Sequence, residues 1–499
     1  MRFRGDLDFQ ERNLATGSIA LGAAALLLIW WVGFSRARRS LRLGVLLGVV
    51  GLLGVGMALF RIRGVTGDLV PILAFRWERT GRPASAEVSS DAPKPVSPVV
   101  HAEVPRPDFA QFLGPARTAV LPGPLLGADW AERPPEIRWR RKVGAGWSGF
   151  VIVGDRVLTQ EQDQGNECVT CYELATGRDV WTHAYAARYD NPVGGEGPRA
   201  TPTVVDGAVY TLGSTGMLHA LDLQTGRVRW SRDLVADTGA RMPEWGYAGS
   251  PLVQDGVVIV SAGGRDGQSL VAYRTSTGER AWAAGTAAAG YGSPFLTTLA
   301  GRRQILAYNH RFITAHDAAD GTVLWEYPWG TGQPYAAVPV VAGPNRVAFS
   351  AGYGVGTELL EIARDANGTF SAERVWQSRK LKAKFANPVA REGFLYGLDD
   401  GLLACLDLND GRDRWKQGRY GHGQGLLVGD LYLLMAESGE LVLLRPTPDG
   451  PNELHRFRVF DSKTWNPIAL SGDLLLVRND QEAACLRLPL APAKVASGH

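Results

Sequence analysis

Two cysteines, Cys168 and Cys171, have the spacing in this sequence that most resembles a redox or metal-binding motif. A C-x-x-C pair serves in disulfide chemistry and forms half of many zinc sites. The few histidines show no ligand spacing, and we find no Ser-His-Asp set, paired carboxylates or phosphate-binding loop. Whether the two cysteines can form a disulfide or bind a metal therefore depends on the strands that position them.

A second set of residues is suited to binding. Aromatic or basic side chains recur shortly before Thr-Pro, Ser-Pro, Asn-Pro and related dipeptides, as in WGYAGSP and KTWNP. They are Trp147, Arg199, Trp245, Tyr247, Tyr291, Tyr335, Lys384, Phe385, His422, Lys463 and Trp465. Aromatic rings stack on planar groups, and basic groups make charge-assisted hydrogen bonds to anions. We expect these residues to line a central funnel that binds a ligand or partner; the alternative is that they only pack the axis.

The elements that would position these residues are repeats. The stretch LHALDLQTGRVRW ends at Trp230 and has counterparts elsewhere in the chain. Aligning them gives Trp139, Trp181, Trp230, Trp282, Trp325, Trp376 and Trp415, with Phe457 in the eighth place. Their spacing of 39 to 52 residues is typical of four-stranded propeller blades. Each unit predicts an inner strand, two further strands and a tryptophan strand, with the funnel residues just before the inner strand.

The repeated tryptophans are predicted to be structural. In the pattern A-x-D-x-x-T-G-x-x-x-W, the indole docks on a neighbouring blade, the small residue leaves room and the glycine permits the turn. Cys171, Cys405 and Cys485 occupy the small-residue position, so we interpret them as core residues. Cys168 should point to the opposite face of the strand from Cys171. We therefore expect neither a metal site nor a disulfide at this pair.

The ends of the repeat region complement each other. The last unit ends at EAACLRLPL without a tryptophan strand, whereas IRWRRKVG (137–144) precedes any complete unit. We expect this N-terminal strand to pair with the last blade, because ring closure removes open sheet edges. The predicted fold is all-β: an eight-bladed β-propeller over residues 109–490, closed by an N-terminal strand and followed by a C-terminal tail, 491–499.

Two apolar stretches, 19–34 and 43–60, precede the propeller and are close to the length that crosses a bilayer. They predict a two-helix transmembrane hairpin as a membrane anchor within residues 1–63. Arginines between the spans favour a cytoplasmic link and a propeller outside the inner (cytoplasmic) membrane, on its periplasmic side, although arginines at the outer flanks oppose this. Residues 64–108 are predicted to be a juxtamembrane segment and a Pro-rich linker. The net charge of +3 indicates no nucleic-acid partner.

The docking pattern resembles the tryptophan repeat of pyrroloquinoline quinone (PQQ)-type eight-bladed propellers. Members include quinoprotein alcohol dehydrogenases and the lipoprotein subunit of the outer-membrane β-barrel assembly machine. The lead-in FAQFLGPARTAVLPG (109–123) is similar to that of uncharacterised membrane-tethered propellers in bacteria. The enzymes of this family hold PQQ between a tryptophan and a disulfide of adjacent cysteines, with a calcium ion and a catalytic aspartate. This sequence has no adjacent cysteines, and no residue is assigned a catalytic role.

Three functions remain open. The first is a non-catalytic, membrane-anchored, extracytoplasmic scaffold that binds a protein, peptide or small ligand at the funnel and needs no cofactor. The second, which the resemblance implies, is a PQQ-dependent oxidoreductase that uses PQQ with Ca²⁺. The third is binding of cell-wall polysaccharide through the aromatic residues.

Overall fold

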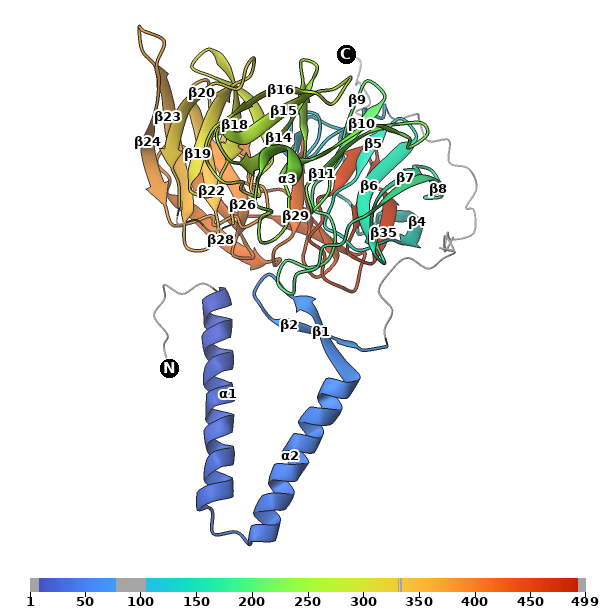
Figure 1. Cartoon of the computed structure of the whole chain (residues 1–499), viewed down its shortest axis with the longest axis vertical. Helices are drawn as coiled ribbons and strands as arrows, with labels where there is room; N and C mark the ends of the chain where they lie inside the picture. The colour runs from blue at the N-terminus through green and yellow to red at the C-terminus, as the bar shows by residue number, and fades with distance from the viewer. Residues whose placement is uncertain (1–8, 78–104, 331, 333, 492–499) are drawn as a thin grey trace, which may run out of the picture. The chain divides into compact units, whose positions relative to one another are not determined.

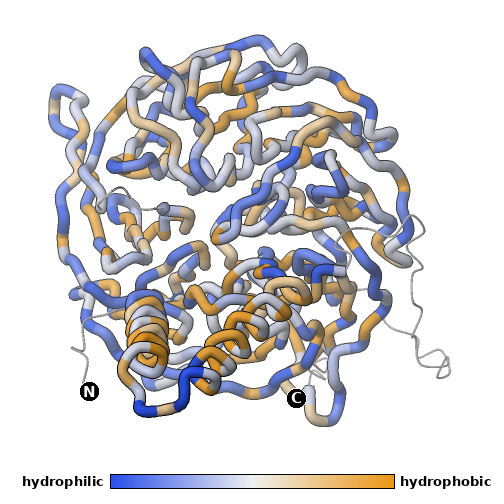
Figure 2. Tube along the Cα trace, turned by 60° about the horizontal axis from the view of Figure 1, so that its bottom comes forward, coloured by the Kyte–Doolittle hydropathy of each residue, from blue (hydrophilic) through white to orange (hydrophobic). Residues whose placement is uncertain are grey.

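The computed structural model describes residues 9–77, 105–330, 332 and 334–491. The chain divides into an N-terminal unit, residues 1–80 with 190–195, and a larger unit, residues 81–189 and 196–499 (Figure 1). Most of the predicted Pro-rich linker and nearly all of the predicted C-terminal tail lie outside the described residues. Within the larger unit, the strands are arranged around a central axis (Figure 2).

The larger unit is an eight-bladed β-propeller in which each blade has four antiparallel strands, and the seventh blade gains a fifth, parallel strand. The first four blades are β5–β8 (Val151–Val153, Arg156–Asp163, Asn166–Glu173, Asp179–Ala186), β9–β12 (Thr203–Val205, Ala208–Leu212, Met217–Asp222, Val228–Asp233), β13–β16 (Leu252–Gln254, Val257–Gly264, Gln268–Arg274, Arg280–Ala284) and β17–β20 (Phe295–Leu299, Arg302–Tyr308, Phe312–Asp317, Val323–Pro328). A short helix, α3 (Leu234–Thr238), follows β12.

The last four blades continue the same order and include two strands from the beginning of the propeller segment. They are β21–β24 (Val340–Val341, Arg346–Ala351, Gly356–Arg364, Phe370–Ser378), β25–β28 (Val389–Arg391, Phe394–Asp399, Leu402–Asp407, Asp413–Arg419), β29–β32 (Gln424–Val428, Leu431–Met435, Glu440–Leu444, Glu453–Arg458) with β3 (Val120–Leu121), and β33–β35 (Ala469–Ser471, Leu474–Arg478, Glu482–Arg487) with β4 (Glu136–Lys142).

Burial changes from the axis outward in the way the repeat predicts. Second strands such as β10 and β30 are buried at every residue, because both of their faces pack against neighbouring blades. In the fourth strand β12, Trp230 is the one buried residue. Each blade thus combines apolar central strands, which are buried, with a half-exposed outer strand that carries one large aromatic side chain.

Closure of the ring occurs as predicted. Strand β4 pairs with β35, and Trp139 lies opposite Cys485, just as Trp230 lies opposite Ala220 within the second blade. The N-terminal strand therefore completes the eighth blade. A second N-terminal contact was not predicted: β3 runs parallel to β29 in the seventh blade.

The indole N–H groups of most repeat tryptophans donate to a backbone carbonyl of the following blade. These bonds run from Trp139 to Leu174 (2.8 Å), Trp181 to Leu223 (2.9 Å), Trp230 to Thr275 (2.8 Å), Trp376 to Leu408 (3.0 Å) and Trp415 to Thr447 (2.8 Å). Trp325 instead donates to Gln304 Oε1 of its own blade at 2.8 Å. Each inter-blade bond satisfies a polar indole nitrogen while the ring covers the neighbouring sheet.

The lead-in before β4 crosses the propeller axis. Its backbone bonds to Ile152 in the first blade and Val204 in the second, and Arg117 donates to Ser250 O and Pro251 O in the third, both at 3.0 Å. It then reaches the seventh blade as β3. Several of its contacts, such as Gly154 N to Asp108 Oδ1 (2.9 Å), fall at turns that follow inner strands. The backbone contacts of residues 107–121 thus lie along inner strands or at the turns that follow them, whereas the Arg117 side chain reaches carbonyls just before β13.

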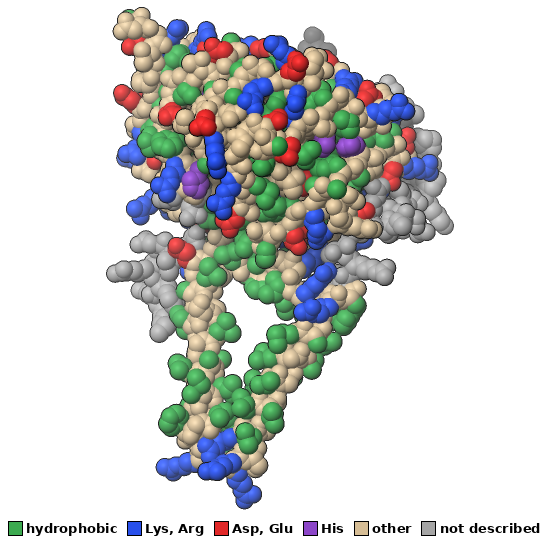
Figure 3. Space-filling view, in the orientation of Figure 1, with side chains coloured by type: hydrophobic (Ala, Val, Ile, Leu, Met, Phe, Trp, Pro, Cys, Tyr) green, Lys and Arg blue, Asp and Glu red, His purple; other side chains and the backbone are tan. Residues whose placement is uncertain are grey.

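The N-terminal unit contains two long helices, α1 (Phe9–Phe34) and α2 (Arg39–Leu59), with no buried residue in either. Both are long and apolar enough to cross a membrane, and apolar side chains cover them while Lys and Arg gather at the turn between them (Figure 3). Strands β1 (Phe60–Val65) and β2 (Pro71–Phe75) form an antiparallel hairpin. The predicted boundary at residue 63, between the anchor and the juxtamembrane segment, therefore falls within β1 of this hairpin.

Candidate functional site

The loops before the inner strands are held together by a belt of hydrogen bonds around the axis. On one side of the ring, Gly149 N donates to Thr201 Oγ1 at 3.0 Å. Thr201 N donates to Ser250 Oγ at 2.9 Å, and Ser250 N donates to Ser293 Oγ at 2.9 Å. Thr201, Ser250 and Ser293 each precede a proline in the repeat. A small hydroxyl at this position therefore links each loop to the next blade.

The belt continues with amide side chains on the other side of the ring. Asn387 Oδ1 accepts from Val338 N at 3.0 Å, and Asn387 Nδ2 donates to Gln424 Oε1 at 3.3 Å. Asn466 Nδ2 donates to Gly146 O at 3.0 Å and to Ser148 O at 2.9 Å. These bonds fix the backbone of the loops, and with it the aromatic and basic residues that come one to three positions earlier.

Five of the predicted funnel residues come together in one group, which we call the aromatic-lysine cluster: Trp147, Phe385, His422, Lys463 and Trp465. Lys463 Nζ lies 4.6 Å from the ring centre of Trp147 and 3.8 Å from that of Trp465. The ring centres of these two tryptophans are 4.9 Å apart. Phe385 lies 5.0 Å from Trp465 and 5.8 Å from His422. Phe385, Lys463 and Trp465 are partly exposed, so the cluster presents a cation beside aromatic rings.

A carboxylate that the sequence analysis missed orients this cluster. Glu437 Oε1 accepts from Trp465 Nε1 at 2.9 Å, and Glu437 Oε2 accepts from His422 N at 3.1 Å. Glu437 lies in the turn between β30 and β31, and its backbone O accepts from Thr464 N at 3.0 Å. Because the repeat alignment considered only the loops before inner strands, it contained no signal for a residue from this turn.

Arg199, Trp245 and Tyr291 form a second group on the other side of the axis. Trp245 and Tyr291 have ring centres 5.6 Å apart, and the Tyr291 hydroxyl accepts from Trp245 N at 3.3 Å. The Arg199 guanidinium lies 4.6 Å from the ring of Tyr189, another residue that was not predicted. Burial lowers the pKa of Arg199 to about 10, so the guanidinium remains charged at neutral pH. This group also combines a cation with aromatic rings.

The remaining predicted residues lie in packed surroundings. Tyr247 is buried, and its hydroxyl donates to Ala262 O at 3.1 Å. Tyr335 is 1% exposed and packs edge-on against Trp329, with ring centres 6.2 Å apart. Tyr247 and Tyr335 are therefore placed as core residues of the propeller.

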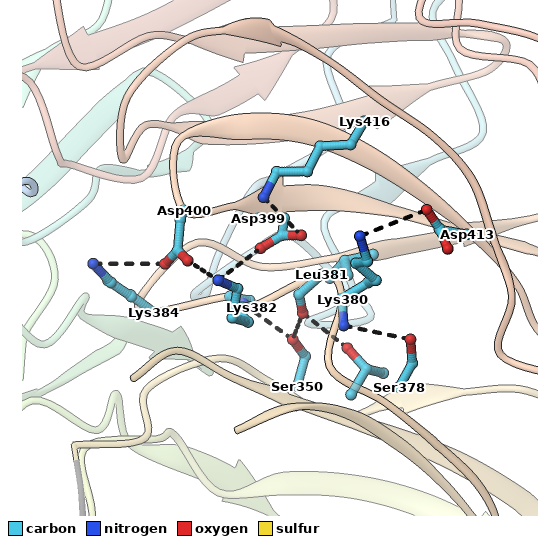
Figure 4. A network of polar contacts seen from close by, with 12 residues as sticks. Ser350, Ser378, Lys380, Leu381, Lys382, Lys384, Asp399, Asp400, Asp413 and Lys416 are labelled. Carbon is cyan, nitrogen blue, oxygen red and sulfur yellow. Dashed lines mark hydrogen bonds and ion pairs between the residues drawn. The ribbon is translucent and has the colours of Figure 1, made fainter. Parts of the chain in front are cut away.

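Lys384 belongs to a buried charge network (Figure 4). Its Nζ lies 3.7 Å from Asp400 Oδ1, and Lys382 also pairs with Asp400. Asp399 faces Lys382 at 3.7 Å and Lys416 at 3.0 Å. The network joins the loop before β25 to the β26–β27 turn and to β28, so Lys384 holds this region together.

The described residues do not supply the donor set that PQQ and calcium require in the enzymes of the resembling family. None of the four cysteines forms a disulfide, and among the described residues no three His, Cys, Asp or Glu side chains converge on a metal-sized site. Burial raises the pKa of Cys171, Cys405 and Cys485 to about 12, so these thiols stay protonated at neutral pH. The two groups described above supply aromatic rings for stacking and cations for ion pairing.

Comparison with protein families finds a match to a PQQ-repeat family described as "Outer membrane protein assembly factor BamB", over residues 165–417. Quinohemoprotein alcohol dehydrogenase ADH-IIG of Pseudomonas putida is 32% identical over 211 residues, which are 37% of this chain and 28% of the enzyme. The quinohemoprotein alcohol dehydrogenase of Comamonas testosteroni is 31% identical over 152 residues, 28% of this chain and 21% of the enzyme. The chain therefore spans less than a third of the length of these relatives.

Two solved structures share the propeller architecture. The C. testosteroni enzyme superposes with a TM-score of 0.53 at 13% identity, covering 79% of this chain and 82% of that chain. The P. putida enzyme gives a TM-score of 0.51 at 14% identity, covering 72% of this chain and 77% of that chain. At this identity, the likeness concerns the fold alone.

Proposed function

The chain belongs to the PQQ-repeat propeller family described by the assembly factor BamB, and from this premise we propose that it is a non-catalytic, membrane-anchored binding module. Helices α1 and α2 anchor it in the inner membrane, with the arginine-rich turn in the cytoplasm and the propeller on the extracytoplasmic side. The aromatic-lysine cluster binds a partner protein or peptide through a carboxylate or a planar side chain. A small ligand with the same groups would use the same contacts.

The observation that carries this proposal is the cation beside aromatic rings in the loops before the inner strands. The backbone of residues 107–121 bonds to inner strands and to the turns that follow them, while the Arg117 side chain extends to Ser250 O and Pro251 O just before β13. The loops before the inner strands carry Lys463, whose Nζ lies beside two indoles. A cation beside aromatic faces attracts carboxylates and also stacks planar groups. The belt of hydrogen bonds holds the loops in place, so little ordering would be required on binding.

Site-specific photo-crosslinking in cells of the source organism tests the proposal. A photoreactive residue replaces Phe385 in the full chain, and a matched control replaces Arg412, whose side chain is 84% exposed on an outer turn. We expect one discrete adduct at position 385, absent at 412 and abolished by Lys463→Gln. Absence of any adduct at 385, or the same adducts at both positions, would contradict a binding role for the cluster.

The enzyme alternative has its own discriminating experiment. It is favoured by the 32% identity to a quinohemoprotein alcohol dehydrogenase. It is opposed by the free state of all four cysteines, since the resembling enzymes hold PQQ against a disulfide. The purified full chain is incubated with PQQ and Ca²⁺ and then desalted. We expect the quinone absorbance to leave with the small molecules. Retained quinone together with dye reduction by alcohols would replace our proposal with a PQQ-dependent oxidoreductase.

A further inference from the structure

The β1–β2 hairpin is fixed to one end of the two-helix unit. Helix α2 ends at Leu59 and β1 begins at Phe60. After β2, Arg76 N donates to Leu59 O at 2.9 Å, and Arg76 Nε donates to Met57 O at 2.7 Å. These bonds satisfy carbonyls that the helix end leaves open. The orientation of the hairpin is therefore tied to the axis of α2.

Helix α1 holds the tip of the same hairpin. Gln10 Nε2 donates to Gly67 O at 2.7 Å, and Asn13 Nδ2 donates to Asp68 O at 2.8 Å. Both acceptors lie in the turn between β1 and β2. The hairpin thus bridges the start of α1 and the end of α2, the end of the unit away from the arginine-rich turn (Figure 1).

One face of the hairpin is apolar and exposed. Phe60 pairs with Phe75, and Ile62 pairs with Leu73, so these four side chains share a face. Ile62 is 63% and Leu73 is 62% exposed, and the following Trp77 is 65% exposed. The Phe60 and Phe75 rings lie 4.7 Å apart, and the Phe75 and Trp77 rings 4.8 Å apart. Such a contiguous apolar face is typical of an interaction surface.

Its position and charge indicate what covers this face. Helix α2 has 21 residues and at about 1.5 Å per residue is about 30 Å long, the thickness of a bilayer core. The hairpin then begins where the core ends, at the depth where Trp residues gather in membrane proteins. Arg61, Arg63 and Arg76 accompany the aromatic residues, and arginines near a membrane surface attract anionic headgroups.

We propose that the β1–β2 hairpin, residues 60–77, is a lipid-binding element that lies in the interface of the bilayer. The apolar face enters the boundary between headgroups and acyl chains, and the arginines contact lipid phosphates. This proposal rests on the membrane insertion of α1 and α2 that is part of the proposed function. In this position, the hairpin fixes the tilt of the helix pair.

The test uses the full chain reconstituted in phosphatidylcholine vesicles with and without phosphatidylglycerol. The fluorophore NBD is attached at Phe75→Cys, at Ile72→Cys as the control on the other hairpin face, and at Leu47→Cys within α2. The four native cysteines are buried, so labelling is performed on the folded chain. We expect the label at 75 to be quenched by nitroxide lipids spin-labelled near the headgroup, and to have a several-fold lower iodide quenching constant than the label at 72.

Each outcome either supports or overturns the proposal. If iodide quenches the labels at 75 and 72 equally while the label at 47 is lipid-shielded, the helices insert but the hairpin lies in water, and this inference fails. If the label at 47 is also exposed to iodide, the anchoring part of the proposed function fails. A label at 75 that is shielded from iodide but not quenched by nitroxide lipids indicates a covering protein, which overturns the lipid assignment.

The arginines provide a second variant. Arg61→Gln with Arg63→Gln keeps the apolar face and removes two charges. We expect the unmodified arginines to make the label at 75 more lipid-shielded in vesicles with phosphatidylglycerol than in phosphatidylcholine alone, and this difference to vanish in the double variant. An unchanged difference would show that the arginines do not contact anionic headgroups.

Discussion

The indole of Trp230 lies directly over Gly278 in the next blade: a Cβ atom added at Gly278 would be 2.6 Å from Trp230 Cδ2. The same relationship joins Trp139 with Gly177, Trp181 with Gly226, Trp282 with Gly321 and Trp376 with Gly411. The repeat glycine therefore has two roles. It adopts the positive φ of the turn, +70° at Gly278, and it leaves the space that the neighbouring indole fills.

Replacing Gly278 by alanine separates these two roles. Gly256→Ala is the matched control, because Gly256 has a φ of +76° and no atom within 4 Å of an added Cβ. We expect Gly256→Ala to lower the free energy of unfolding by about 1 kcal/mol through backbone strain. Gly278→Ala should lose about 1–3 kcal/mol more, because the rigid indole must shift. Denaturant unfolding measures both, and equal losses would contradict the docking contact.

Removing the indole provides the complementary measurement. Trp230→Ala is expected to lower the free energy of unfolding by about 3–5 kcal/mol, as for other large-to-small changes in a core. In that background the additional loss caused by Gly278→Ala should disappear, because the atoms it contacts are gone. A near-neutral Trp230→Ala would show that the indole adds little cohesion between blades.

The eight blades could be predicted from the sequence because each repeats a short-range pattern. Strand, turn glycine and Trp230-type residue lie within about a dozen positions, so local chemistry defines them. Closure was also predictable, since IRWRRKVG and EAACLRLPL are the two halves of one unit. Both predictions depend on features that recur along the chain, and comparison between repeats revealed them.

The site could be predicted only in part because its contacts join different repeats. The repeat alignment placed Trp147 and Trp465 in corresponding loops, but it could not show that Lys463 lies beside both rings. Glu437 belongs to a different turn, and Arg117 reaches the third blade from a lead-in that precedes the repeats. Such partners are set by tertiary geometry, for which one sequence carries no periodic signal.

Truncation tests ring closure and the lead-in separately. A chain beginning at residue 105 retains both the lead-in and β4. A chain beginning at 124 retains β4 but not the lead-in, and a chain beginning at 146 retains neither. We expect thermal midpoints to fall in that order, because the second loses the segment that contacts several inner strands and the third also loses the strand that pairs with β35. Equal midpoints for the chains that begin at 124 and 146 would show that β4 does not hold the ring closed.

Stability should fall in mild acid because of a buried histidine. His219 packs against His183 and Tyr185, with ring centres 5.1 and 4.5 Å away, and burial, with a smaller contribution from His183, lowers its pKa to about 4. The unfolded chain, with a histidine pKa of about 6.5, binds more protons between these values, so the folded state loses stability as pH falls through this window.

The expected loss at His219 is about 2 kcal/mol in the free energy of unfolding between pH 7 and pH 5. Denaturant unfolding at the two pH values measures it in the native chain and in His219→Gln. The variant should lose about 2 kcal/mol less over the same interval, since it carries no imidazole to protonate. The same loss in both proteins would assign the pH dependence to other groups.

The charge network at the β26–β27 turn gives the last prediction. Asp399 is fully buried, and the described lysines that face its carboxylate are Lys416 at 3.0 Å and Lys382 at 3.7 Å. Lys416→Met removes the closer cation and leaves a desolvated carboxylate, so we expect a loss of about 3 kcal/mol in the free energy of unfolding. Lys380→Met is the control, because Lys380 and Asp413 are about half exposed, with 3.8 Å between Nζ and Oδ2; it should lose less than about 1 kcal/mol.

A double variant shows whether the loss comes from the stranded carboxylate. Asp399→Asn combined with Lys416→Met removes the buried charge together with its partner, and it should recover at least about 1 kcal/mol relative to Lys416→Met alone. Denaturant unfolding of the three variants completes the cycle. If Lys416→Met and Lys380→Met lose equally little, water reaches Asp399, and the network does not fix the loop that carries Lys384. The loop would then depend on the hydrogen-bond belt, in which Asn387 joins Val338 to Gln424.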